Sequence, residues 1–198
     1  MPLPDDITYA PGRIEDIRKN VNKAYSEAPE NMEALFSTAL DQLTDLQFNV
    51  SQAFANYLNT PDDTIPQTVS AAVKDAQRIG LGAIRALADR MKDSATYLAD
   101  HEVPKLQVET TDLVLVKREI DDRFKVAINL HENNDPQALE PMLQVARDYR
   151  RYIDQAQAKK AGSQAVTIRE RRRQVIVYIS GILSLISIIL AIINLLRR

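Results

Sequence analysis

The sequence contains no cysteine and no tryptophan, and it has only 5 glycines and 2 histidines among 198 residues. The absence of cysteine excludes a disulfide framework, Cys-based zinc sites, iron–sulfur clusters and a thiol nucleophile. Two histidines cannot form a His-rich metal site. The small number of glycines argues against a Gly-rich phosphate loop and against a turn-rich all-β fold. The residues that most often bind cofactors or metals are therefore absent or too few, and we expect no cofactor and no metal.

The two histidines are the remaining candidates for chemistry. His101 lies between Asp100 and Glu102, and His131 precedes Glu132. Neither has the spacing of a His-Glu-x-x-His site or of a Glu-x-x-His bundle site. Both lie near predicted helix ends, where a cation complements the helix dipole. We interpret them as capping or surface residues, with a metal or acid–base site as the alternative, and we expect no enzyme and no catalytic residue.

The charges are divided unevenly along the chain. Residues 1–146 contain 14 basic and 24 acidic residues, whereas residues 147–173 contain 9 basic and 3 acidic residues. The basic stretch lacks the interleaved aromatic residues of a stacking platform, and the larger part is acidic, so no nucleic-acid binding is expected.

The long apolar run near the C-terminus is the dominant feature. Residues 175–196 read VIVYISGILSLISIILAIINLL, without one formal charge. As a helix this run spans roughly 33 Å, which is enough to cross a hydrocarbon core of about 30 Å. We therefore predict a transmembrane helix over residues 174–196; a fully buried core helix is the alternative.

Basic residues on both sides of the run predict its orientation. The arginine cluster before it consists of Arg169, Arg171, Arg172 and Arg173, and Arg197 and Arg198 follow it. The larger cluster favours the N-terminal domain on the cytoplasmic side of a single-pass, tail-anchored protein. Each arginine near an anionic leaflet contributes about 1 kcal/mol, so we expect the cluster to contact anionic lipid head groups. A topology signal alone is the alternative.

Apolar residues upstream recur every three or four positions, which predicts amphipathic helices. The expected helices run from Arg13 to about Ala28, over 32–58, from Thr64 or Pro66 to His101, from Thr111 to about Glu132, and from Asp135 onward. A short hairpin over 106–116 is an alternative to a linker followed by helix. Pro141 is expected to bend or restart the last helix, and Gly162-Ser163 is expected to be a weak point or hinge. Gly80 and Gly82 suggest a bend or a close helix contact.

The predicted fold is all-α: a cytosolic helical bundle of four to five helices followed by one C-terminal transmembrane helix. We divide the chain into a flexible N-terminus (1–12), an acidic helical bundle (13–158), a basic juxtamembrane segment (159–173), the transmembrane helix (174–196) and a basic C-terminus (197–198).

Small and polar residues recur at helical spacing within the apolar run. They form a serine stripe of Ser180, Ser184, Ser187, Ala191 and Asn194. In lipid, small residues allow close helix approach and serine or asparagine can hydrogen-bond across the contact, so the stripe predicts self-association into a homo-oligomer. Two functions follow: a membrane-tethered interaction or scaffold module for an unknown cytosolic protein, or a membrane-perturbing, pore-forming oligomer.

Overall fold

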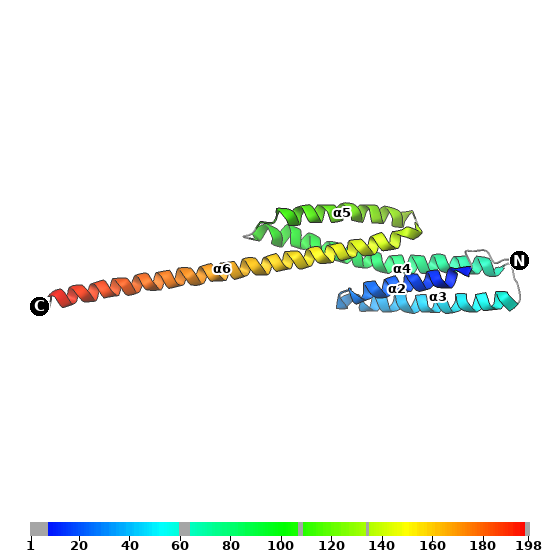
Figure 1. The fold of residues 1–198 in the computed structure, drawn as a ribbon, viewed down its shortest axis with the longest axis horizontal. Coiled ribbons are helices and arrows are strands. Elements are labelled where there is room, and N and C mark those ends of the chain that lie inside the picture. Colours follow the sequence, from blue (N-terminus) through cyan, green and yellow to red (C-terminus); the bar gives the residue numbers. More distant parts are fainter. Residues whose placement is uncertain (1–7, 60–63, 107–108, 134, 197–198) are drawn as a thin grey trace.

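The computed structural model describes residues 8–59, 64–106, 109–133 and 135–196, and for 178–196 it describes the backbone alone. It is all-helical within these residues and has five α-helices (Figure 1). These are α2 (Ala10–Ser26), α3 (Glu33–Asn59), α4 (Thr64–Tyr97), α5 (Thr111–Glu132) and α6 (Leu139–Leu196). The all-α prediction is confirmed. Because α5 begins at Thr111, the hairpin alternative does not form in the described part of 106–116.

Local sequence signals explain most of the helix ends. Helix α2 begins at Ala10 rather than at Arg13, because Pro11 occupies its first turn, where a missing N–H costs nothing. Helix α4 ends in a single π turn, Leu98–Glu102, and Val103-Pro104 begins a short 3-10 turn after it. The side chain of Asp135 accepts a hydrogen bond from the Gln137 backbone N–H at 2.8 Å and caps a short 3-10 turn, Pro136–Ala138. The α-helix expected from Asp135 begins only after this turn, at Leu139.

The helices form two three-helix units that share α4. Its N-terminal half packs against α2 and α3, and its C-terminal half packs mainly against the first part of α6, which also packs against α5 (Figure 1). Phe36 and Leu43 of α3 are fully buried in the first unit, and Tyr149 and Tyr152 of α6 are buried in the second. The apolar stripes that the sequence spacing predicts thus face neighbouring helices, except at Val116 of α5, which is exposed.

Gly80 lies where α2 crosses α4. A Cβ built on Gly80 would lie 2.5 Å from Cγ2 of Ile17 and 3.3 Å from Cγ2 of Val21, whereas a Cβ on Gly82 meets nothing within 4 Å. The close contact expected near these glycines is therefore confirmed for Gly80, and Gly82 faces solvent.

Helix α6 is continuous over its 58 residues, which corresponds to about 87 Å at 1.5 Å per residue. Pro141 falls in its first turn, where proline is tolerated, so it neither bends nor restarts the helix. Gly162 and Ser163 lie within unbroken helix. Beyond the bundle α6 continues alone toward the C-terminus (Figure 1); we call residues 161–177 of this projecting part the stalk.

No helix among the fully described residues combines the length and apolar character that a membrane crossing requires. Most of the predicted transmembrane segment 174–196 lies outside these residues, because its side chains are not described from residue 178 onward. The membrane helix therefore stays a prediction from the sequence.

Candidate functional site

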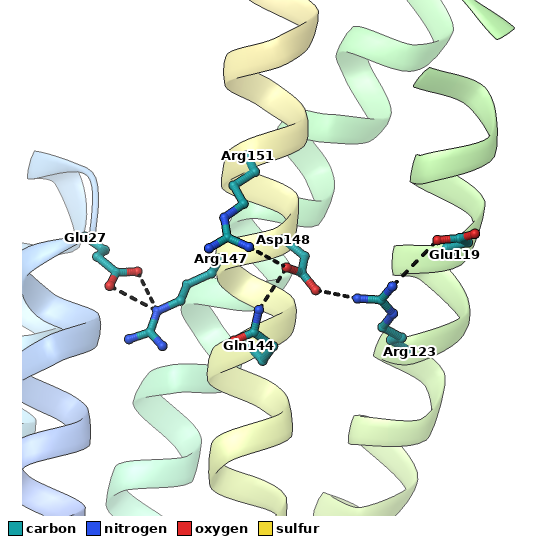
Figure 2. Close-up of polar contacts among 7 residues, drawn as sticks. All are labelled: Glu27, Glu119, Arg123, Gln144, Arg147, Asp148 and Arg151. Atoms are coloured by element: carbon teal, nitrogen blue, oxygen red, sulfur yellow. Dashed lines mark hydrogen bonds and ion pairs between the residues drawn. The ribbon is translucent and has the colours of Figure 1, made fainter. Parts of the chain in front are cut away.

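Two consecutive residues of α6, Arg147 and Asp148, form a charged junction between the two three-helix units. Figure 2 shows Arg147 directed toward α2 and Asp148 directed toward α5. Neighbours on a helix are separated by about 100°, so one dipeptide can contact helices on different sides. The junction joins segments that lie far apart in the sequence.

On the α2 side of the junction, arginines of α6 contact Glu27, the residue that follows the C-terminal end of α2. Nε of Arg147 donates to both carboxylate oxygens of Glu27 at 3.1 Å, and Nη1 of Arg150 donates to the Glu27 carbonyl at 3.3 Å. The Arg147 side chain is only 15% exposed. Its Nη2 is buried and has no hydrogen-bond partner among the described residues. Glu27 is therefore the group that compensates most of the desolvation of this guanidinium.

The α5 side of the junction centres on Asp148, whose side chain is 10% exposed. Its carboxylate accepts hydrogen bonds from Nη1 of Arg123 at 2.8 Å and from Nε2 of Gln144 at 2.9 Å. Arg151 lies 3.6 Å away, and Arg123 also lies 3.6 Å from Glu119 (Figure 2). A buried carboxylate with three such neighbours is compensated, so Asp148 holds α5 against α6.

A second polar contact between α5 and α6 lies next to Asp148 in the sequence. The buried hydroxyl of Tyr149 donates to Asp121 at 2.7 Å, and Nζ of Lys117 donates to the same carboxylate at 2.8 Å. Burial, and then the hydrogen bond to Asp121, raise the pKa of Tyr149 far above its ordinary value. Tyr149 is therefore a neutral hydrogen-bond donor and not a proton-transfer group at physiological pH.

The base of the stalk is fixed to the bundle by two lysines. Nζ of Lys159 contacts Asp112 at 2.7 Å and donates to the Glu109 carbonyl at 2.8 Å, and Nζ of Lys160 lies 2.7 Å from Glu102. The hydrogen bonds from Lys160 and Lys159 hold the pKa values of Glu102 and Asp112 below their ordinary values of 4.5 and 3.8. These two contacts link the end of α4 and the start of α5 to α6.

Acid is expected to release these contacts. A lowered carboxyl pKa in the folded state means that its contribution to stability is complete above the ordinary pKa and is lost as the pH falls through the folded value. Carbon-detected NMR titration in micelles should therefore give Glu102 a midpoint below 4.5. Lys160→Met should return that midpoint toward 4.5 and leave the midpoint of Asp112 unchanged. An unaltered Glu102 midpoint in this variant would show that Lys160 is not its partner.

The two histidines do not form a common site. His101 stacks on Tyr97 with ring centroids 4.8 Å apart, and its Nδ1 lies 3.2 Å from the Tyr97 carbonyl. His131 lies in the last turn of α5, as expected from the helix dipole. Among the described residues no group of three or more His, Asp or Glu side chains could hold a metal ion.

Two clefts lie between the helices. The larger has a volume of about 960 Å³ and lies between α2, α4 and the start of α6, with Arg13, Lys74, Asp16 and Glu140 on its walls. The smaller, of about 530 Å³, lies between α4 and α6 near Tyr97 and Ile153. Both are lined by charges of both signs, so neither has the electrostatic bias of an anion or cation site.

The arginine cluster lies on the stalk, and all four of its side chains are exposed. The exposure leaves them accessible to head groups, while the lipid contact itself stays a prediction. The serine stripe from Ser180 to Asn194 falls on residues whose side chains lie outside the described part of the chain.

The junction was not predicted from the sequence, although one signal was present. Asp148 lies among the apolar positions Val145, Ala146, Tyr149 and Tyr152, all of which are buried. A carboxylate within a core-facing stripe requires a buried partner. Sequence spacing could not identify Arg123 and Glu27 as the two facing groups.

No family model, no curated protein and no solved structure matches this chain. The described residues define an all-α bundle from which one long helix projects.

Proposed function

We propose that this protein is a membrane-tethered interaction or scaffold module. The apolar run 175–196 anchors it as a single-pass protein, and its acidic helical bundle faces the cytoplasm and presents a surface to a cytosolic protein. The single observation that carries the proposal is the uncharged 22-residue run directly after the arginine cluster.

Helix geometry supports this assignment. Helix α6 continues without interruption from the bundle through the arginine cluster to Leu196, so the apolar run begins about 22 Å beyond Lys160, which forms an ion pair with Glu102 of the bundle. Val175, Ile176 and Val177 at the start of the run are exposed, by 55%, 64% and 65%. An apolar helix surface of this kind is stabilised by lipid.

The arginine cluster and the serine stripe give the anchor two further roles. The cluster binds anionic head groups and sets the topology, with the bundle on the cytoplasmic side. The stripe brings copies together within the bilayer, through close backbone approach and hydrogen bonds between serine and asparagine side chains.

The full-length protein should remain with membranes after carbonate washing and should float with phosphatidylcholine vesicles. Carbonate removes peripheral proteins and leaves spanning helices in place. Recovery of the folded chain in the supernatant would refute the anchor, and with it the proposed function.

Replacing Ser184, Ser187 and Asn194 together by leucine should weaken self-association severalfold in bilayers while membrane insertion is retained. Energy transfer between labelled copies measures the association. Dye release from vesicles in the same samples separates the two functions: intact vesicles support the scaffold, and stripe-dependent leakage supports the pore. Unchanged association in the triple variant would show that the serine stripe does not mediate self-association.

A further inference from the structure

Helices α2 and α3 form a hairpin on one side of the bundle. They pack against each other and against α4, whereas α5 packs against α6 on the opposite side (Figure 1). The chain leaves α3 at Asn59 and enters α4 at Thr64, so the hairpin is joined covalently to α4 at this end. The turn between α2 and α3, residues 27–32, lies at the other end, and we call it the tip of the hairpin.

The hairpin is held together by contacts of its own. Arg18 donates to Glu15 within α2 at 2.9 Å, and the rings of Tyr25 and Phe36 stack between α2 and α3 with their centroids 5.8 Å apart. Arg13 takes part in a further interaction, and it lies in the first turns of α2, at the end of the hairpin that is joined to α4. The hairpin is therefore a unit that can move as a whole.

The contact between the hairpin and α4 is made by apolar and small residues. Ile17 and Val21 of α2 lie over Gly80, and Ala76, one turn before Gly80 on the same face of α4, is fully buried. A small residue carries little apolar surface, so each of these α4 residues contributes less to the contact than a leucine would. Apolar contacts of this kind separate and re-form without breaking hydrogen bonds.

At its tip the hairpin is joined to α6 by Glu27, whose carboxylate accepts from Nε of Arg147 at 3.1 Å. This contact has a cost, because the Arg147 side chain is only 15% exposed and its buried Nη2 has no partner among the described residues. Release of the tip returns the guanidinium to water, so the net contribution of the pair to stability is small while both partners are present. We call the Glu27–Arg147 pair the latch.

On the other side of the bundle, α5 is fastened to α6 along its length. Hydrogen bonds join the two helices at three positions, which are Asp112 to Lys159, Asp121 to Tyr149 and Arg123 to Asp148. Asp148 and Tyr149 are buried. A helix secured along its length separates at a higher free energy than a hairpin secured at its tip.

We propose that the α2–α3 hairpin is a lid on α4, which opens at its tip when the latch separates, while α4, α5 and α6 stay folded. Opening exposes the face of α4 around Ala76 and Gly80, together with Arg147. The opening follows from contacts inside the bundle and does not depend on the anchor. For the scaffold proposed above, the lid adds a surface that is presented to a cytosolic protein in the open state alone, and this use of the surface rests on the proposed function.

Native-state hydrogen exchange of the full-length protein in phosphatidylcholine vesicles tests the lid directly. A detached hairpin loses its packing, and isolated helices are marginal in water, so its amides exchange in the open state. Amides of α2 and α3 should share one opening that occurs at least about tenfold more often than the opening of α5. If all helices exchange with the same opening constant, the bundle unfolds as one unit and the lid is wrong.

Variants of the latch should change this opening selectively. Glu27→Ala should raise the opening constant of α2 and α3 about thirtyfold, because Arg147 is left buried without its acceptor in the closed state. The double variant Glu27→Ala/Arg147→Met should return the constant to within about fivefold of the natural chain.

Tyr149→Phe is the matched control for the latch. It removes the hydrogen bond to Asp121 whether the lid is open or closed, so it should speed exchange of α5 and leave the opening of α2 and α3 unchanged. An effect of Tyr149→Phe on α2 and α3 equal to that of Glu27→Ala would overturn the lid.

The cysteine-free sequence allows a second measurement by thiol labelling. Ala76→Cys, on α4 beneath the hairpin, and Ala127→Cys, on α5, each replace a fully buried alanine. The thiol at position 76 should react at least about tenfold faster than the thiol at position 127, and Glu27→Ala should accelerate it about thirtyfold. Equal rates at the two positions would show that one common opening exposes both, which would contradict the lid.

These outcomes separate the lid from the anchor. If the protein floats with vesicles but its helices exchange as one unit, the lid is wrong and the anchor stands. If the protein does not float with vesicles, the proposed function fails, and the same exchange measurement on the protein in solution decides the lid.

Discussion

Gly80→Ala is expected to lower the free energy of unfolding by about 1–3 kcal/mol, because the new methyl group overlaps a packed neighbour. Its Cβ would lie 2.5 Å from Cγ2 of Ile17. The side chain of Ile17 is branched at Cβ, so the helix restricts it to one preferred rotamer and this methyl group cannot turn away. Helix α2 must therefore move away from α4. Urea unfolding followed by circular dichroism measures the change.

Gly82→Ala is the matched control, two residues along the same helix. Nothing lies within 4 Å of the Cβ position at Gly82, so only the gain in helix propensity acts there. This variant should be more stable than the natural chain by about 0.5–1 kcal/mol. Ile17→Ala, which removes the overlapping methyl group, should make Gly80→Ala less harmful than it is alone. If Gly80→Ala and Gly82→Ala both stabilised the fold, or both destabilised it, the close contact at Gly80 would be contradicted.

Glu27→Ala is expected to destabilise the fold by about 2 kcal/mol, because it leaves the Arg147 guanidinium largely buried without its acceptor. Arg147 is 15% exposed and already has one buried donor without a partner. In the double variant Glu27→Ala/Arg147→Met the stranded charge is gone. Its stability should return to within about 1 kcal/mol of the natural chain, giving a clear coupling energy in a double-mutant cycle.

Glu119 supplies the control for this cycle. It also pairs with an arginine, Arg123, but the side chains are 70% and 57% exposed and the ion pair is 3.6 Å long. Glu119→Ala should therefore change stability by less than about 0.5 kcal/mol. If the double variant at Glu27 and Arg147 is as unstable as the sum of the single variants, the two residues do not interact.

The start of α5 and the apolar faces were predictable from the sequence because they depend on local signals. The break at Val103-Pro104 and the spacing of Leu113, Ile120 and Phe124 give a helix from Thr111, where the structure begins it. Gly80 and Gly82 together were predicted to mark a bend or a close helix contact, because two glycines within one helical turn are costly in a helix. Each of these features depends on residues within one or two helical turns.

The pairing of helices was not predictable, because periodicity shows which face is buried and not which helix covers it. Glu27 and Arg147 are separated by 120 positions, and no local pattern connects them. The continuity of α6 was likewise undecided by sequence, since Pro141 and Gly162 are both helix breakers when taken alone. Position decides their effect: Pro141 lies in the first turn, and Gly162 lies within a helix that keeps its backbone hydrogen bonds.

The unbroken backbone of α6 also fixes the rotational orientation of the bundle around the axis of the anchor that we propose. Every residue of such a helix rotates what precedes it by about 100°, and seven residues restore the direction to within about 20°. The number of residues between Lys160 and the apolar run therefore determines the angle at which the bundle is held relative to that run. One residue more or less at Arg169, beyond the last partly buried position of α6, would turn the bundle by about 100° relative to the apolar run and leave the contacts inside the bundle unchanged.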